Sequence, residues 1–508
     1  MSDADPPEPT PPAWRGPAQA VAVGLLTLLL CAWQAGRVGV TWDEACWYFA
    51  GARALDAWWA AGAPLDTFAL SRALHGDWHP PGIKLLAWLA HALTPSAWPE
   101  WYRWRMGGPA LLGVTTGLVF LAVRPRLGLL AAACAVGGLL AQPQLLAHAS
   151  VMGTDAPLAA CAVLALVSLA AAEDDRRWRV ALHLALGGAI LIKLSGLAVV
   201  GGAALSALAL RNRRTLAHVG IAAGWGLLLL VLLYPAWELG DWFGHLGRLR
   251  EHPIPVVFLG ERMARPPLHW IAVTLVAVPP AGWLVMVLLG VGALLRARDR
   301  WALALLPPAG VWLLFFATPL APRHDGARQI AFVCAVLGVA GGIGLARLAT
   351  GLAARAGPRR AGPLSALALV LPLSGLVAWW RAQPYPLSCF SGLVGGLPGA
   401  ARLGFEPTFY WDACTPATWR ELNALLPPGA RVSTLLTMGY VEEARRLGLA
   451  RADLVEAWPE EATHLLVLRR TSLWTPDLEA RRAATELVRA WSHPSAPEVP
   501  LLELRRRP

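Results

Sequence analysis

The sequence predicts a mostly α-helical, polytopic membrane protein of about eleven transmembrane helices that ends in a small C-terminal α/β domain. Of its 508 residues, 56% are hydrophobic and only 15% are charged, and the mean hydropathy is +0.47. A soluble domain typically has about 25% charged residues. Apolar runs recur along most of the chain, whereas its last part alternates strand-like and helix-like segments. This composition excludes a purely soluble enzyme, a disordered chain and a collagen-like chain.

The apolar runs define a membrane domain at residues 17–381, after a Pro-rich tail at residues 1–16 that we expect to be disordered. We expect no secretory signal, because the first run follows an acidic, Pro-rich lead. Two runs between residues 180 and 210 are short for crossings of about 20 residues each. They form either two abbreviated helices with a turn at 193–196 or one long tilted helix, which would change the parity. The runs are residues 17–36, 106–123, 127–143, 155–172, 180–193, 195–210, 217–236, 270–295, 301–320, 329–346 and 363–380.

The placement of the arginines supports the eleven-span parity. The chain has 44 basic and 33 acidic residues, a formal net charge of +11. With the N-terminus in the cytoplasm, every short loop that must be cytoplasmic contains at least two arginines, whereas the opposite loops near 144–154 and 194–196 contain none. This is the positive-inside pattern, and it accounts for much of the charge without nucleic acid. The arginine-containing loops are Arg124–Arg126, Glu173–Arg179, Arg211–Arg214, Arg296–Arg300 and Arg347–Arg360.

Three segments are then external: two loops at residues 37–105 and 237–269, and the C-terminal domain at residues 382–508. The C-terminal domain alternates strands and helices, which favours a small α/β unit. We predict strands at Arg431–Thr437, Thr463–Leu468 and Leu501–Leu504, and helices at Tyr440–Leu447 and Pro476–Trp491.

The first external loop opens with two acids, Asp43 and Glu44, directly after the first span. Acids at a membrane surface are costly to desolvate and need a reason. One alternative is that they cap a helix over residues 43–62, whose Trp, Ala and Leu face suits the membrane interface. His79-Pro80-Pro81 follows and opens another short helix, which contains Lys84.

Further charged residues fall on the same side of the membrane. Asp155 opens the fourth span, where helix capping is again the alternative, and Lys193, one of only two lysines in the chain, lies at the turn between the short spans. Arg323, His324 and Arg328 lie in another external turn. Carboxylates and cations gathered at one face suggest a base that acts beside an anionic substrate. Parity gives these residues a shared side, not contact.

The order of these motifs resembles the family 39 glycosyltransferases, the superfamily of protein-mannosyltransferases and aminoarabinose transferases with the GT-C fold. The resemblance covers residues 17 to about 415 and, more loosely, the C-terminal tail. It rests on the acidic pair Asp43-Glu44, the Pro-Pro motif His79-Pro80-Pro81, the acidic motif Thr154–Leu158 and the turn Lys193-Leu194-Ser195. Further downstream, several motifs resemble a bacterial branch of the family. They are Gly260–Arg262 with His269-Trp270, His324–Gln329, Pro384–Ser388, Leu393–Gly396 and Tyr410-Trp411. Where that branch usually has Tyr-Tyr/Phe-Asn, this chain has Cys389-Phe390-Ser391.

The resemblance implies a multi-pass inner-membrane enzyme that moves a sugar from a polyprenyl-phosphate carrier to a glycan, lipid or protein acceptor. Transfer would occur at the extracytoplasmic face, by single displacement with inversion. Asp43 would be the general base, with Glu44 and Asp155 as further catalytic candidates; Asp155 would orient the acceptor or an active-site cation or water. The candidates for binding the donor phosphate are Lys193, Arg323, Arg328, Lys84 and His79, and those for binding substrate are His324 and Trp42.

We predict no cofactor, and we assign no metal because Glu44 and His79 supply only two candidate ligands. The seven cysteines show no CxxC or Cys/His spacing typical of zinc. Cys389 and Cys414 are both external and could pair. The expected partners are the lipid-linked donor, membrane lipid and an unidentified acceptor, and not nucleic acid.

Two other classes of protein compete with this interpretation. A transporter or lipid flippase would explain the spans, but it predicts charges near the membrane midplane and broken helices in related halves. The charges gather at one face here, and no twofold internal repeat is evident. A membrane-anchored scaffold whose tail binds a partner fits the C-terminal domain alone.

Overall fold

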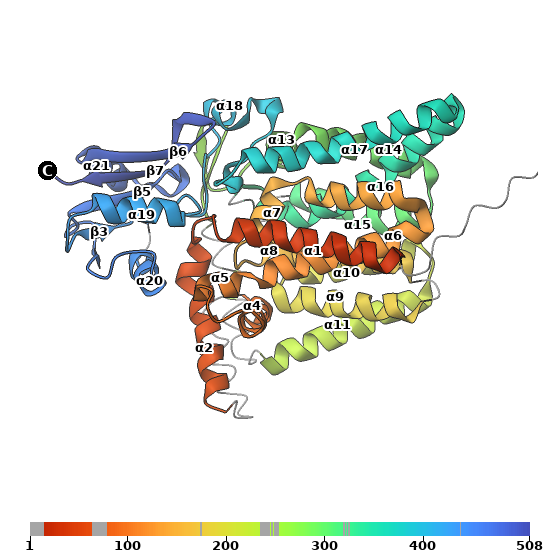
Figure 1. Ribbon diagram of the computed structural model, residues 1–508, viewed down its shortest axis with the longest axis horizontal. Coiled ribbons are helices and arrows are strands. Elements are labelled where there is room, and N and C mark those ends of the chain that lie inside the picture. The colour runs from red at the N-terminus through yellow and green to blue at the C-terminus, as the bar shows by residue number, and fades with distance from the viewer. Residues whose placement is uncertain are drawn as a thin grey trace, which may run out of the picture.

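The computed structural model describes residues 15–62, 79–172, 175–233, 244, 247, 253–318, 321, 323, 326–436 and 438–508. It is a bundle of long apolar helices with a mixed α/β region at one end, at the left of Figure 1. This agrees with the predicted fold class. The bundle consists of α1 (Arg15–Ala35), α6 (Gly107–Leu140), α8 (Asp155–Ala171), α9 (Arg176–Ile192), α10 (Gly196–Ala209), α11 (Arg213–Leu233), α13 (Trp270–Ala277), α14 (Ala281–Ala297), α15 (Arg300–Phe316), α16 (Ala331–Ala356) and α17 (Pro358–Arg381).

Within the described residues, every predicted apolar run falls on helical segments, and all but the run at 270–295 fall mainly on one helix each. α6 contains two of the runs and is interrupted at Gly128, where φ is +85°. The alternative of two separate helices between residues 180 and 210 is confirmed, because Lys193 has an extended backbone that ends α9 before α10 begins. Within the described residues, five helical segments are long and apolar enough to cross a membrane, or six if one bent pair counts as a span. The number of crossings therefore stays a prediction.

The predicted single span at residues 270–295 is wrong in shape. It consists of α13 and α14, which meet at an angle of 118°. Pro279 and Pro280 lie between the two helices, and proline removes a backbone donor and clashes with the preceding turn. A broken element of this kind brings the start of α14 to the same end of the bundle as the charged loops.

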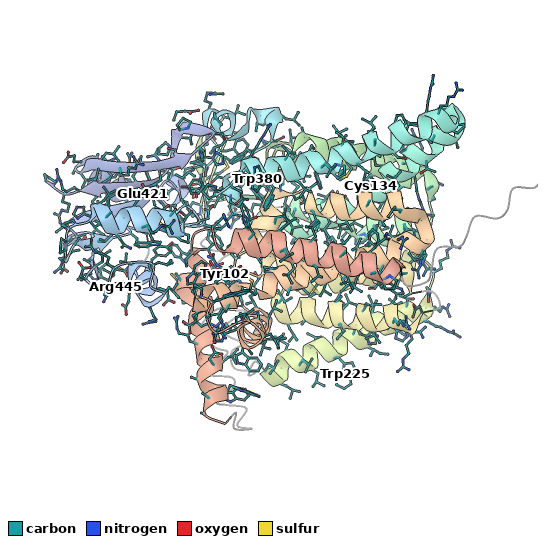
Figure 2. All side chains as sticks on the ribbon, viewed as in Figure 1. Tyr102, Cys134, Trp225, Trp380, Glu421 and Arg445 are labelled. Atoms are coloured by element: carbon teal, nitrogen blue, oxygen red, sulfur yellow. The ribbon has the colours of Figure 1, made fainter. Side chains whose placement is uncertain are left out.

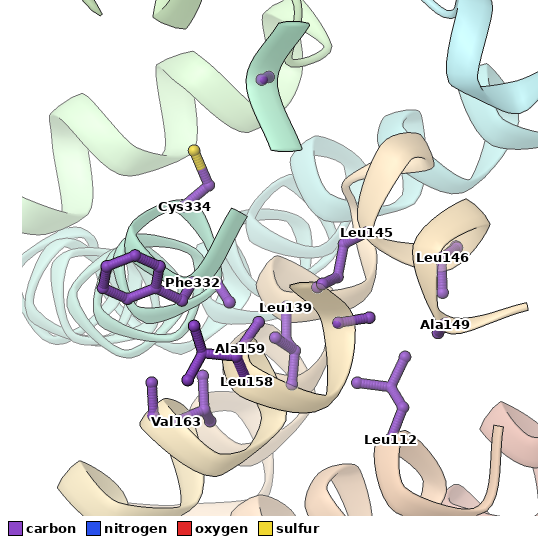
Figure 3. Packing of buried hydrophobic residues seen from close by; sticks show 14 of the residues in the cluster. Leu112, Leu139, Leu145, Leu146, Ala149, Leu158, Ala159, Val163, Phe332 and Cys334 are labelled. Carbon is purple, nitrogen blue, oxygen red and sulfur yellow. The ribbon is translucent and has the colours of Figure 1, made fainter. Parts of the chain in front are cut away.

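The centre of the bundle is packed from small and aliphatic side chains. Figure 3 shows leucines of α6 and α8 meeting α16 and the short helix α7 (Pro143–Ala149). Glycines allow the closest approaches: a Cβ atom on Gly138 of α6 would lie 2.1 Å from the backbone oxygen of Gly338 in α16. Membrane helices commonly pack through small residues in this way. Large apolar side chains remain on the outside, including Trp225 and Trp380, which are 60% and 62% exposed (Figure 2).

Short helices cross the end of the bundle beside the C-terminal region (Figure 1). The helix expected over residues 43–62 is present as a π-helical turn, η1 (Glu44–Tyr48), that continues into α2 (Phe49–Ala60). The helix expected after the Pro-Pro motif is α4 (Gly82–Leu93), and it is followed by α5 (Glu100–Arg105).

The C-terminal region, residues 382–508, contains a mixed five-stranded sheet in the order β4-β3-β5-β7-β6. β3 pairs in parallel with β4 and β5, whereas β7 is antiparallel to β5 and β6. The strands are β3 (Arg431–Ser433), β4 (Val455–Glu456), β5 (His464–Leu468), β6 (Glu486–His493) and β7 (Ala496–Arg506), and the helices are α18 (Gly396–Arg402), α19 (Pro416–Leu425), α20 (Tyr440–Arg446) and α21 (Pro476–Ala483).

Two predictions about this region need correction. The helix expected at Pro476–Trp491 ends at Ala483, and residues 486–493 form β6 instead. Pairing of β6 with β7 decides the conformation of residues that read as helical on their own. The strand expected at Arg431–Thr437 ends at Ser433, and Thr437 lies outside the described residues. The other predicted strands and the helix α20 are present.

Candidate active site

The carboxylate of Asp43 lies in a cluster formed by three distant parts of the chain. The Tyr410 hydroxyl, from the C-terminal region, donates a hydrogen bond to Asp43 Oδ2. Arg328, from the 3₁₀ turn η2 (Gly326–Ile330), lies 3.3 Å from the same oxygen and also donates to the Tyr410 hydroxyl. The guanidinium stands 4.7 Å from the centre of the Tyr410 ring. The side chains of Asp43 and Arg328 are 17% and 14% exposed, so solvent reaches both.

Backbone pairing fixes the position of Asp43. The Gly39 amide donates to the oxygen of Asp412 at 3.1 Å, and the Trp42 amide donates to the oxygen of Tyr410 at 3.2 Å. Two backbone hydrogen bonds therefore join the first loop to the C-terminal region, both from residues just before Asp43. Asp43 precedes η1, but its side chain makes no capping hydrogen bond there. Helix capping therefore does not explain this acid.

The adjacent acid, Glu44, is fully buried and belongs to an internal ion pair. Its two oxygens accept from Arg105 Nε and Nη2 at 2.7 Å each, from the Met152 amide at 2.7 Å, and from the amide and hydroxyl of Thr41 at 2.8 and 3.0 Å. Arg105 also donates to the backbone oxygens of residues 35, 38 and 39. Through these contacts, Glu44 holds the first loop against α5 and against the residues that follow α7.

A second carboxylate–cation pair lies beside the first. Lys193 Nζ donates to Asp155 Oδ1 at 2.6 Å, and the side chains are 18% and 7% exposed. Arg328 and His148 also interact with the charge of Asp155. Asp155 is the first residue of α8, and the N-cap residue before it, Thr154, makes no side-chain capping hydrogen bond. The turn that carries Lys193 is tight, since a Cβ atom on Gly196 would lie 2.1 Å from the backbone oxygen of Ala189.

Two small adjoining cavities open next to Arg328. One is lined by residues of α7, η2 and the Pro279 bend, and the other by Gln144, His148, Arg328, Leu387, Phe409 and Tyr410. Sequence reasoning did not select His148 and Gln144, and it noted Tyr410 only as part of a motif. His148 and Gln144 both lie in α7, where the sequence predicted a short loop near residues 144–154 that stood out only by its lack of arginine. The edge of the His148 ring faces Tyr410, with 6.3 Å between the ring centres.

The other predicted cations lie in different surroundings. Arg323 donates to the backbone oxygens of Pro266, Pro267 and Thr318, which ties a loop to the end of α15. Lys84 is fully buried, and its aliphatic stem packs against Gly51 of α2, where a Cβ atom would lie 2.7 Å from Lys84 Cδ.

The remaining predicted site residues are two histidines and a tryptophan. The His79 ring meets the Tyr48 ring edge-on, with 5.5 Å between centres. Trp42 packs partly buried against the core, next to Asp43. His324 lies outside the described residues.

Among the described residues, one group could hold a metal ion: Asp56 of α2, His91 of α4 and Glu100 of α5, whose ligand atoms lie within 4.8 Å of one another. His91 Nδ1 already lies 3.2 Å from Asp56 Oδ2. Sequence reasoning named none of these three. Glu44 and His79, which it considered as ligands, do not occur in this group.

Buried titratable groups lie near Tyr410 in the C-terminal region. Asp412 is fully buried, and its Oδ1 accepts from the Thr408 hydroxyl at 3.1 Å while Oδ2 has no hydrogen-bond partner among the described residues. Burial raises the pKa of Asp412 to about 6. Cys389 and Cys414 are both free thiols here, and so the pairing considered above is not formed.

Comparison with known proteins identifies the fold. Residues 78–237 match the family model for dolichyl-phosphate-mannose-protein mannosyltransferase. The whole chain is similar to ArnT from Cupriavidus metallidurans, at 18% identity and a TM-score of 0.51. The match covers 96% of this chain and 97% of the apo structure, and 97% and 98%, respectively, for the structure of ArnT bound to undecaprenyl phosphate. No curated relative matches the sequence. The predicted resemblance to the family and the GT-C fold is thereby confirmed.

Proposed function

We propose that this protein is a membrane glycosyltransferase that uses a sugar linked to a polyprenyl phosphate. The match to the mannosyltransferase model and the ArnT-like fold both support this class. The observation that carries the proposal is the meeting of Asp43 with Arg328 and Tyr410 beside the Asp155–Lys193 pair, next to the two cavities. A carboxylate and two cations from separate segments thus converge where an anionic donor and an acceptor could meet.

In the proposed reaction, Asp43 accepts the proton of an acceptor hydroxyl while that oxygen attacks the anomeric carbon. The bond from this carbon to the phosphate oxygen breaks, and polyprenyl phosphate leaves with the electron pair, so the configuration inverts. A positioned general base contributes about 10²–10⁴-fold. Tyr410 and Arg328 hold Asp43 Oδ2, which fixes the carboxylate in the cluster.

The leaving phosphate needs cations more than it needs a proton. Lys193 and Arg328 are the cations that support the proposal best, because both lie in the cluster with Asp43 and Asp155. Asp155 orients Lys193 in this scheme. We assign Arg323 and Lys84 to holding the surrounding loops, since one is bound to backbone oxygens and the other is buried against α2.

We further propose that the site faces the extracytoplasmic side of the inner membrane. The short loops rich in arginine support this orientation, because such loops stay in the cytoplasm. The C-terminal region lies at one end of the bundle (Figure 1), and its Tyr410 contacts Asp43. The N-terminus is then cytoplasmic and the C-terminal region is periplasmic.

The test is transfer in proteoliposomes supplied with radiolabelled undecaprenyl-phosphate sugars and a cell-envelope extract as acceptor. We expect label to move from the lipid carrier to an acceptor in the wild type and not in Asp43→Asn. Movement of the intact donor across the bilayer, with no transfer, would instead identify a flippase. Mass spectrometry of envelope glycans from cells with and without the protein then identifies the sugar and the acceptor.

A further inference from the structure

Tyr440, at the start of α20, reaches from the C-terminal region to the segment that carries Asp43. Its side chain is 1% exposed, and its hydroxyl donates to the backbone oxygen of Val40 at 2.6 Å. Val40 lies three residues before Asp43, between the two backbone hydrogen bonds of Gly39 and Trp42. The hydroxyl therefore holds one side of the Asp43–Tyr410 contact.

The ring of the same residue holds the other side of that contact. It stacks on Trp411 with 4.8 Å between centres, and Trp419 lies 6.3 Å away on a nearly parallel plane. Trp411 directly follows Tyr410 and has a φ of +65°. A bulky residue in this left-handed region is strained and persists only when its surroundings fix it. The stacked rings supply these surroundings.

A charged contact anchors the helix that carries Tyr440. The two terminal nitrogens of Arg53, Nη1 and Nη2, donate to Glu443 at 2.7 and 2.9 Å, and Glu443 is 4% exposed. Arg53 belongs to α2, which continues from the turn after Asp43. α20 is thus attached to the first loop both before and after the proposed base.

We propose that Tyr440 is a positioning residue through which the C-terminal region sets the orientation of the Asp43 carboxylate against Tyr410. This inference rests on the proposed function for its effect on turnover, but not for its effect on the structure. Tyr440 does not touch the cavities and acts through Val40 and Trp411. The C-terminal region is then a part of the catalytic apparatus and not only a platform for partners.

The experiment compares Tyr440→Phe with Tyr102→Phe. Both variants lose a hydroxyl that donates to a backbone oxygen, but Tyr102 bonds to Ala32 of α1, away from the Val40–Asp43 segment. A misplaced catalytic group can cost up to about 100-fold, and we expect turnover to fall about 10- to 100-fold in Tyr440→Phe with KM unchanged. Tyr102→Phe should keep the wild-type turnover. In a Tyr410→Phe background, Tyr440→Phe should cost much less, because the contact it supports is already missing.

Hydrogen exchange gives a readout that needs no activity. In Tyr440→Phe, the amides of residues 38–45 and 408–415 should exchange faster than in the wild type and in Tyr102→Phe. Unchanged exchange in these peptides, or a fall in turnover equal to that of Tyr102→Phe, would overturn the proposal. A wild type without glycosyl transfer would refute the proposed function, while the exchange result would still decide whether Tyr440 holds the two segments together.

Discussion

Replacing Asp43 and Glu44 one at a time separates a catalytic acid from a structural one. In Asp43→Asn, one amide oxygen can still accept from Tyr410 and Arg328, so the loss is mainly the charged part of these hydrogen bonds. Charged hydrogen bonds are worth about 1 kcal/mol more than neutral ones. The Asp43 side chain is also 17% exposed, which limits the cost of any mismatch. We therefore expect a folded protein whose turnover is lower by about two to four orders of magnitude.

Glu44→Gln should behave in the opposite way. Each oxygen of Glu44 accepts from one nitrogen of Arg105 and from one backbone amide. An amide nitrogen at either position therefore faces two donors in a fully buried place. Breaking one partner of a buried pair costs about 3–5 kcal/mol, because the remaining charge has no counterion. We expect a large fall in thermal stability and, in any protein that folds, activity above that of Asp43→Asn.

The assay combines thermal unfolding in detergent with initial rates of label transfer for the same preparations. Arg105→Lys serves as the control for Glu44, since it keeps the charge but cannot reproduce the forked contact. An active Asp43→Asn enzyme would refute the assignment of the base and would leave Asp155 as the next candidate. A Glu44→Gln protein as stable as the wild type would refute the structural role of the buried pair.

Three further predictions follow from the charges around the site and from the arginine pattern. Lys193→Ala should weaken donor use sharply and Lys193→Arg should recover only part of it, because a guanidinium is not an ammonium; unchanged donor kinetics in a folded Lys193→Ala protein would leave the lysine a role in packing alone. Burial raises the pKa of Asp412 from 3.8 to about 6, so the folded state binds this proton more tightly than the unfolded state. The stability that protonation of Asp412 contributes is therefore fully present below about pH 4 and is lost as the pH rises through 6. The stability of Asp412→Asn relative to the wild type should therefore increase as the pH rises from about 4 to 6, by up to about 3 kcal/mol for a shift of about two units. A difference in unfolding temperature that does not change with pH would contradict the shift. A reporter that is active only in the cytoplasm should be silent when fused after Pro508, and a strong signal would show that a span has been miscounted.

Much of the bundle could be predicted because membrane helices leave a strong signal in sequence. Long apolar runs need no partner to be recognised, and arginine loops order them. The break at Pro279 and the strand β6 were missed for different reasons. Two prolines inside an apolar run do not reveal the angle of the bend. β6 forms only because β7 lies beside it, and single-segment patterns do not contain that pairing.

The candidate site was predictable in its side of the membrane but not in its contacts. Parity placed Asp43, Asp155, Lys193 and Arg328 at one face, and the structure brings these four together. Arg323, which parity placed at the same face, instead donates to backbone oxygens of Pro266, Pro267 and Thr318. Tyr410 was missed as a site residue because it lies 367 positions from Asp43, and no local pattern links them.

The acids at 43 and 44 show why position in a helix decides what a carboxylate can do. Successive residues of a helix point about 100° apart, so two neighbours cannot face the same surroundings. Asp43 faces Arg328 and Tyr410, which line one of the cavities, and its side chain is 17% exposed. Glu44 points into the interior and is matched there by Arg105 and backbone amides. We infer that the buried, fully bonded Glu44 fixes the loop and thereby keeps the partly exposed Asp43, the proposed base, in place. The pair therefore works as one unit, with the structural acid holding the position that the proposed base needs.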